Sequence, residues 1–249
     1  MDPNQAFLLA HIACGFSALT TGIVPMIARK GGKSHKFWGN VYYWSMVGVC
    51  VTTLGMFALR PAEFRLQFFL CIAVLSFYFT FSGDRVLRMK KSATQATVSD
   101  RVAAGLALAC GLAMLGYAAY SHLVLHNSMI AVLFGIFGTV IGFEGRRDLR
   151  LFSGRADSEK MHWYFGHISK IMGAYTATLT AFCVNMGRYL PENLPAYARF
   201  IPWLVPAVLL GVGTSYYAKR QREKRKMAVT YGPLTKVLRW MLVKNTAPM

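Results

Sequence analysis

The sequence predicts an all-α fold: a polytopic membrane helix bundle with seven transmembrane helices, its N-terminus outside and its C-terminus in the cytoplasm. Composition is the first observation behind this prediction, because 55% of the 249 residues are hydrophobic and only 15% are charged. Soluble domains carry about 25% charged residues. The second observation is a series of long apolar runs, and the third is the uneven placement of positive charge between them.

Seven apolar runs define the predicted helices, since a helix needs roughly 20 mostly apolar residues to cross the hydrocarbon core of a bilayer. The runs are Phe7–Ala28, Trp38–Leu59, Phe64–Leu87, Val102–Leu123, Ser128–Phe143, Trp163–Met186 and Phe200–Tyr217. The fifth run is the shortest. Helices are expected rather than barrel strands, because the alternating pattern of such strands is absent and unpaired backbone groups are costly in lipid.

Several local signals support these boundaries. Pro61 marks a tight turn between the second and third runs, and Ser99 with Asp100 can cap the start of the fourth. Small residues let helix backbones approach closely, so the glycines of the fourth and fifth runs predict close packing inside the bundle. These glycines are Gly105, Gly111, Gly116, Gly138 and Gly142.

The 28 lysine and arginine residues are concentrated at one end of the predicted bundle. The connections after the first, third, fifth and seventh helices hold 4, 5, 5 and 9 of them, whereas those on the other side hold only Arg60, Arg65, Arg188 and Arg199. Loops rich in lysine and arginine stay in the cytoplasm. The placement of these cations therefore predicts the orientation of a multi-pass protein in the inner (plasma) membrane. Because this placement accounts for most of the net charge of +18, nucleic acid is not expected as a partner.

Two regions are predicted: a seven-helix transmembrane domain over residues 1–218 and a basic cytoplasmic tail over residues 219–249. Lys219–Lys226 holds six cations and one glutamate. Beyond Pro233, apolar residues at helical spacing predict a short amphipathic helix at the membrane surface, beside anionic lipid. They are Leu234, Val237, Leu238, Met241 and Leu242. The five cysteines share no CxxC spacing, so free thiols are expected.

The predicted topology sorts the six histidines into two layers. His11, His122 and His126 belong to the outer layer, and His35, His162 and His167 to the inner layer. His11 shares a helix face with small residues, so its side chain is expected to point into the bundle. An ionisable group inside a membrane indicates function, although a neutral histidine bonded to a neighbouring helix is the alternative.

Lys170 lies about two turns inside the sixth predicted helix, the most polar of the seven. Its side chain either extends to the inner headgroups or contacts an anionic group of a cofactor or substrate. The sequence leaves both interpretations open.

Haem b is one cofactor that these histidines could bind, since it needs two axial histidines from two helices at one depth. At the inner side His35 would pair with His162 or His167. At the outer side His11 would pair with His122. Two such sites would form an electron path across the membrane. Covalent attachment of haem is not indicated, because the chain has no CxxCH motif.

A zinc or iron site is the alternative use of the inner histidines, His35, His162 and His167, with carboxylates nearby. However, His162 and His167 are five residues apart, about 140° around a helix, and poorly placed to share one ion. The carboxylates of this layer adjoin arginines, so ion pairs are the simpler expectation for them. They are Asp84, Glu144 and Asp148.

The segments HIACGFSALTTGIVPM and SHKFWGNVYYWSM together resemble an uncharacterised family of bacterial multi-pass membrane proteins, known as a domain of unknown function. The residues that carry the likeness are His11, Gly15, His35, Lys36 and Gly39. Lys36 stands where arginine is more usual, and GAYTATLTAF in the sixth helix matches less specifically. The likeness covers about the first sixty residues. It implies a membrane fold and lends no established activity.

Three functions remain open from the sequence. The first is a b-type haem protein that relays electrons between a membrane or periplasmic partner and the cytoplasm. The second is a small-solute transporter, suggested by the polar sixth helix and Lys170. The third is a non-catalytic accessory subunit of another membrane protein, in which the histidines are structural.

Overall fold

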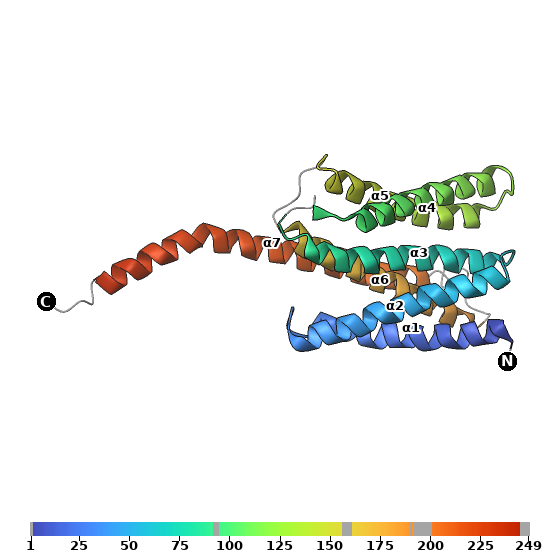
Figure 1. Ribbon diagram of the computed structural model, residues 1–249, viewed down its shortest axis with the longest axis horizontal. Helices are drawn as coiled ribbons and strands as arrows, with labels where there is room; N and C mark the ends of the chain where they lie inside the picture. Colours follow the sequence, from blue (N-terminus) through green and yellow to red (C-terminus); the bar gives the residue numbers. More distant parts are fainter. Residues whose placement is uncertain (1, 92–94, 156–160, 190, 192–200, 245–249) are drawn as a thin grey trace.

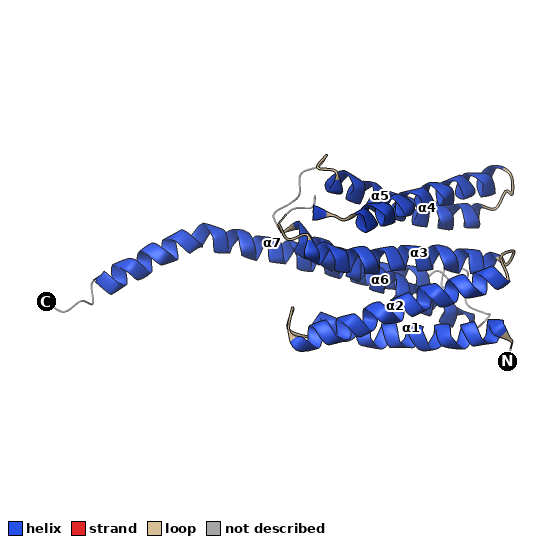
Figure 2. Ribbon diagram, viewed as in Figure 1, coloured by secondary structure: helices blue, strands red, loops and turns tan. Residues whose placement is uncertain are grey.

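The computed structural model describes residues 2–91, 95–155, 161–189, 191 and 201–244, without the side chains of residues 129, 188, 203 and 225–244. Within these ranges all regular structure is helical (Figure 2). The α-helices are α1 (Pro3–Ile27), α2 (Lys33–Leu59), α3 (Phe64–Arg85), α4 (Val98–Leu123), α5 (Ser128–Phe152), α6 (His162–Met186) and α7 (Ile201–Lys244). Short 3₁₀ turns η1 (Val86–Arg88) and η3 (Gly187–Tyr189) follow α3 and α6.

The helices form three stacked pairs. The pairs are α1 with α2, α3 with α6, and α4 with α5, while α7 packs on α6 and continues past the bundle (Figure 1). Successive helices run in opposite directions. We call the end where α1, α3 and α5 finish and α2, α4 and α6 begin the basic end. The N-terminus lies at the opposite end.

The lengths and surfaces of these helices are those of a membrane bundle. The first six contain 22 to 27 residues, or about 33–40 Å, enough to cross a bilayer. Among the described residues, α1, α2, α3 with η1, and α4 are also apolar enough to do so. Large apolar side chains such as Phe16, Leu106 and Leu209 are exposed, which suits lipid as the surrounding medium. A membrane span remains a prediction for α5, α6 and α7.

Two helices extend beyond their predicted ends. Helix α5 runs to Phe152, nine residues past the apolar run, so Glu144 and Asp148 lie within it. Helix α7 is continuous to Lys244 and passes through Pro233, where a separate amphipathic helix is predicted to begin. The side chains of that segment lie outside the described residues, so the division at residue 218 and the surface helix stay predictions.

Two apolar clusters hold the layers together. One joins α3 to α4 and α5, and the other joins α1 and α2 to α6. Close backbone packing between α4 and α5 is confirmed at Gly111, Gly138 and Gly142: a Cβ on Gly111 would lie 2.5 Å from the backbone of Gly142, and a Cβ on Gly138 would lie 2.9 Å from Gly111 O. Gly105 and Gly116 face open space instead. All five cysteines are free, as predicted.

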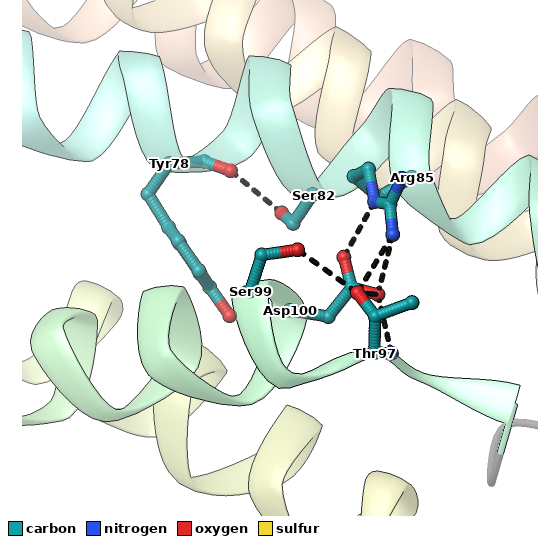
Figure 3. Close-up of polar contacts among 6 residues, drawn as sticks. All are labelled: Tyr78, Ser82, Arg85, Thr97, Ser99 and Asp100. Atoms are coloured by element: carbon teal, nitrogen blue, oxygen red, sulfur yellow. Dashed lines mark hydrogen bonds and ion pairs between the residues drawn. The ribbon is translucent and has the colours of Figure 1, made fainter.

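The start of α4 is tied to the end of α3 by Asp100 (Figure 3). Its carboxylate accepts from Arg85 Nε at 2.6 Å and Nη2 at 2.9 Å. It also accepts from the backbone N–H of Thr97 at 2.8 Å. Asp100 and Thr97 form a capping box, which satisfies backbone donors that a helix start leaves unpaired. Asp100 therefore caps the helix as expected, and Thr97 is its partner.

Replacing Asp100 with alanine is expected to destabilise the protein by about 2 kcal/mol, because a cap and charge-assisted hydrogen bonds are lost together. This corresponds to a fall in Tm of about 4–8 °C. Thermal unfolding in detergent, followed with a thiol-reactive dye on the free cysteines, measures it. Asp100→Asn keeps an acceptor for Thr97 and should lose about half as much. Val98→Ala, at a neighbouring position that is 75% exposed, is the control, and an equal loss there contradicts the prediction.

Candidate functional site

Two inner-layer histidines lie close together at the basic end. His35 lies in the first turn of α2 and His167 in the second turn of α6. Their ring centres are 6.3 Å apart, with the ring planes at 62°. The structure thus brings together His35 and His167, one of the two pairings predicted for the inner side.

Each of these rings is held through Nδ1 by a backbone carbonyl. His35 Nδ1 lies 3.0 Å from Pro25 O in the last turn of α1, and His167 Nδ1 lies 2.8 Å from Gly83 O in the last turn of α3. Carbonyls at the end of a helix lack an intrahelical donor. Because a carbonyl only accepts, each Nδ1 must carry the hydrogen. In the neutral tautomer Nε2 then keeps its lone pair, as in histidines that bind metals.

Charged groups surround this pair. Lys30 Nζ donates to Pro25 O at 2.8 Å and to Met26 O at 2.6 Å, so it caps α1 beside His35. Burial lowers the pKa of the Lys30 amine. Lys30 and Asp84 both interact electrostatically with His167. The pair therefore combines two imidazoles with one cation and one carboxylate nearby.

His162 does not join this pair. It begins α6, in the wall of a separate cavity, and its buried Nε2 has no hydrogen-bond partner in the described part of the chain. Among the described residues, no group of three or more histidine, cysteine or acidic side chains is arranged to hold a metal ion. A three-histidine metal centre at His35, His162 and His167 gains no support from this geometry.

The two outer histidines proposed as a haem pair lie in different layers. His11 Nδ1 is 3.1 Å from Thr52 Oγ1 and 3.3 Å from Thr53 Oγ1, so it links α1 to α2. His122 is exposed on α4, in the opposite outer layer (Figure 1). The contacts of His11 therefore agree with the alternative prediction for this residue, a histidine that is hydrogen-bonded to a neighbouring helix.

Lys170 is turned into the bundle, where it meets two carboxylates of α5. The side chain is 8% exposed. Its Nζ lies 2.5 Å from Asp148 Oδ2, 3.7 Å from Glu144 Oε2 and 3.2 Å from Ser82 Oγ. The anionic partners of Lys170 are thus groups of the protein itself, and it does not contact the histidine pair in the described contacts.

Tyr78 completes this cluster from α3. Its hydroxyl donates to Asp148 Oδ2 at 2.5 Å, and its ring points from α3 toward the α4–α5 layer (Figure 3). Asp148 was expected to pair with an adjacent arginine, and that expectation is wrong: its partners are Lys170 and Tyr78. Of these three carboxylates, Glu144 has such a bond among the described contacts, to Arg147 Nη1 at 3.2 Å. The Glu144–Asp148 spacing of four, with α5 extended, is the signal that could have shown both carboxylates on one face.

Comparison of the chain with protein-family models, with curated proteins and with solved structures gives no match.

Proposed function

We propose that the protein is a multi-pass plasma-membrane protein that binds haem b between His35 and His167. The observation that carries the proposal is the close approach of two histidine rings from two helices, with their centres 6.3 Å apart. His35 and His167 would hold the iron of a b-type haem through Nε2, since Nδ1 of each ring is held by a backbone carbonyl.

The surroundings of the pair support the same proposal. The backbone carbonyls that hold each Nδ1 would fix the tautomer and orient both Nε2 atoms. Lys30 is a cation at the same end of the bundle, which suits the carboxylates of haem. Bound haem would supply one-electron redox chemistry. One site at the basic end favours electron exchange with a redox partner at the cytoplasmic side rather than a two-haem path.

The proposed placement in the membrane rests on charge. Lysine and arginine dominate the basic end, which the positive-inside rule assigns to the cytoplasm. The cations of residues 219–226 would then lie beside anionic lipid. We also propose that the chain belongs to the bacterial membrane-protein family that its first two helices resemble. His11 and His35, which carry that likeness, both hold neighbouring helix segments.

An absorption spectrum of the detergent-purified protein, from cells supplied with haem, tests the proposal. We expect a Soret band that shifts on reduction and haem b that acid–acetone extracts, since no covalent attachment motif is present. His35→Ala and His167→Ala should each lower the haem content at least tenfold.

His11→Ala and His122→Ala are the matched controls, because they remove a histidine at the other end of the bundle and should keep the haem. A colourless preparation overturns the proposal. Haem content that is equal in all four variants also overturns it, because the ligands must then lie elsewhere.

A second candidate, transport of a small solute, is favoured by the buried ion pair of Lys170 and Asp148. Charged side chains inside a membrane bundle often mark substrate or ion pathways. Uptake into vesicles that depends on the protein and disappears in Asp148→Asn would favour this function over electron transfer.

A further inference from the structure

A cavity of about 710 Å³ opens beside Lys170, between α3, α5, α6 and α7. Ligand sites in proteins usually measure about 300–1,000 Å³. His35 and His167 do not line this cavity, whereas Lys170 and His162 do. It is therefore a site separate from the histidine pair, and the inference below does not depend on haem.

The lining of the cavity is strongly cationic. Arg146, Arg147 and Arg150 of α5 line it together with Arg222 of α7 and Lys170. Among the described residues that line the cavity, Asp148 is the one acidic residue, and its carboxylate accepts hydrogen bonds from Lys170 and Tyr78.

The four arginines of the lining differ in the contacts that they make. Arg147 is paired with Glu144, and the guanidinium of Arg222 lies 4.4 Å from the centre of the Phe165 ring. Both Arg146 and Arg150 are exposed. Counted over the described residues and their ion pairs, Arg146 and Arg150 therefore leave the lining with an excess of positive charge.

Two buried polar atoms of the cavity wall have no hydrogen-bond partner among the residues that the structure describes. They are Nε2 of His162 at the start of α6 and Oγ1 of Thr214 on α7. A buried polar atom left unpaired is destabilising, so such atoms normally have a partner in the native state. Their position on two facing helices, in one cationic cavity, indicates a ligand with oxygen atoms and negative charge.

We propose that this cavity binds a phosphate group. Arginine guanidinium groups bind phosphate oxygens through two parallel hydrogen bonds, which a chloride ion cannot accept in that geometry. Arg146 and Arg150 lie one helical turn apart on α5 and can act together. His162 and Thr214 would contact the same group from α6 and α7. A phosphate group reaches this site either as a soluble anion or as the headgroup of an anionic lipid.

Two measurements on the full-length protein separate these sources. Equilibrium dialysis with radiolabelled inorganic phosphate, on protein in a non-ionic detergent, detects the soluble anion. Native mass spectrometry of protein released from phosphatidylglycerol nanodiscs, compared with phosphatidylcholine nanodiscs, detects a retained anionic lipid. We expect saturable binding in one arm.

The double variant Arg146→Gln/Arg150→Gln should weaken binding in that arm at least tenfold, since charge-assisted hydrogen bonds to the phosphate oxygens are lost at both positions. Thr214→Val should weaken it by a smaller factor. The matched control is Arg29→Gln/Arg101→Gln, which removes two cations of the basic end that do not line the cavity. It should change binding less than twofold. The proposal is overturned if neither arm shows binding, or if the control weakens it as much as the cavity variant.

Discussion

Replacing Lys170 with methionine is expected to lower the Tm of the detergent-solubilised protein by about 6–20 °C. The substitution removes the cation that lies 2.5 Å from Asp148 Oδ2 and leaves two carboxylates of α5 in a buried site. Breaking a buried ion pair by removing one partner costs about 3–5 kcal/mol, and 1 kcal/mol shifts Tm by about 2–4 °C in a protein of this size. Unfolding followed by a thiol-reactive dye measures the change.

Two further variants show whether the loss comes from the unpaired carboxylate. Lys170→Met/Asp148→Leu removes both charges and should regain at least half of the lost stability, because the cost lies in the orphaned charge rather than in the missing bond. Lys36→Met makes the same substitution at an exposed lysine and should change Tm by less than 2 °C. A neutral Lys170→Met, or a double variant as unstable as the single one, contradicts the ion pair as a stabilising element.

The sequence singled out Lys170 but not its partners, and the reason is a helix boundary. An apolar run ends where polar residues begin, at Phe143, whereas the α-helix continues to Phe152 because its hydrogen bonds do not depend on hydropathy. With the helix ended at Phe143, Asp148 belongs to a loop and pairs with the nearest arginine. Once α5 is extended, the carboxylate reaches α6, and this contact depends on tertiary packing that no local pattern reveals.

For the histidines, the sequence predicts the depth of each residue in the bundle but not the direction in which its side chain points. Charge patterning places His35, His162 and His167 at one end of the bundle, and the structure places them there too. Whether His162 or His167 faces α2 depends on the rotation of α6 about its axis, since the two point about 140° apart. That rotation is set by packing against α3, where a Cβ on Gly173 would lie 2.9 Å from Phe79 Cδ2. Likewise, His11 and His122 are far apart because α1 and α4 belong to the two outer helix pairs, with α3 and α6 between them.

Glycine patterns predicted close packing in α4 and α5, but they could not tell which glycines make the contact. Gly111, Gly138 and Gly142 lie on the facing sides of the two helices. Gly116, five residues after Gly111, points about 140° away and meets nothing within 4 Å. This difference gives a pair of positions on one helix at which the same substitution should have opposite consequences.

Gly111→Leu is expected to destabilise the protein by about 3 kcal/mol or more, with a fall in Tm of roughly 6–12 °C. The Cβ alone would lie 2.5 Å from Gly142 Cα and N, and 2.8 Å from Gly138 O. These are backbone atoms of α5, which cannot rotate away as a side chain can, so the two helices must move apart. The move would also weaken the contacts of Met114 and Ile141 in the apolar cluster that they share.

Gly116→Leu is the matched control for this prediction. It adds the same side chain to the same helix at an exposed position with open space, and leucine is the better helix former by somewhat less than about 1 kcal/mol. Its Tm should therefore stay the same or rise slightly. If Gly111→Leu is tolerated as well as Gly116→Leu, the backbones of α4 and α5 are not in contact at Gly142. If both variants lose stability equally, the outward face of α4 is covered in the protein, and the α4–α5 pair cannot be an outer layer facing lipid.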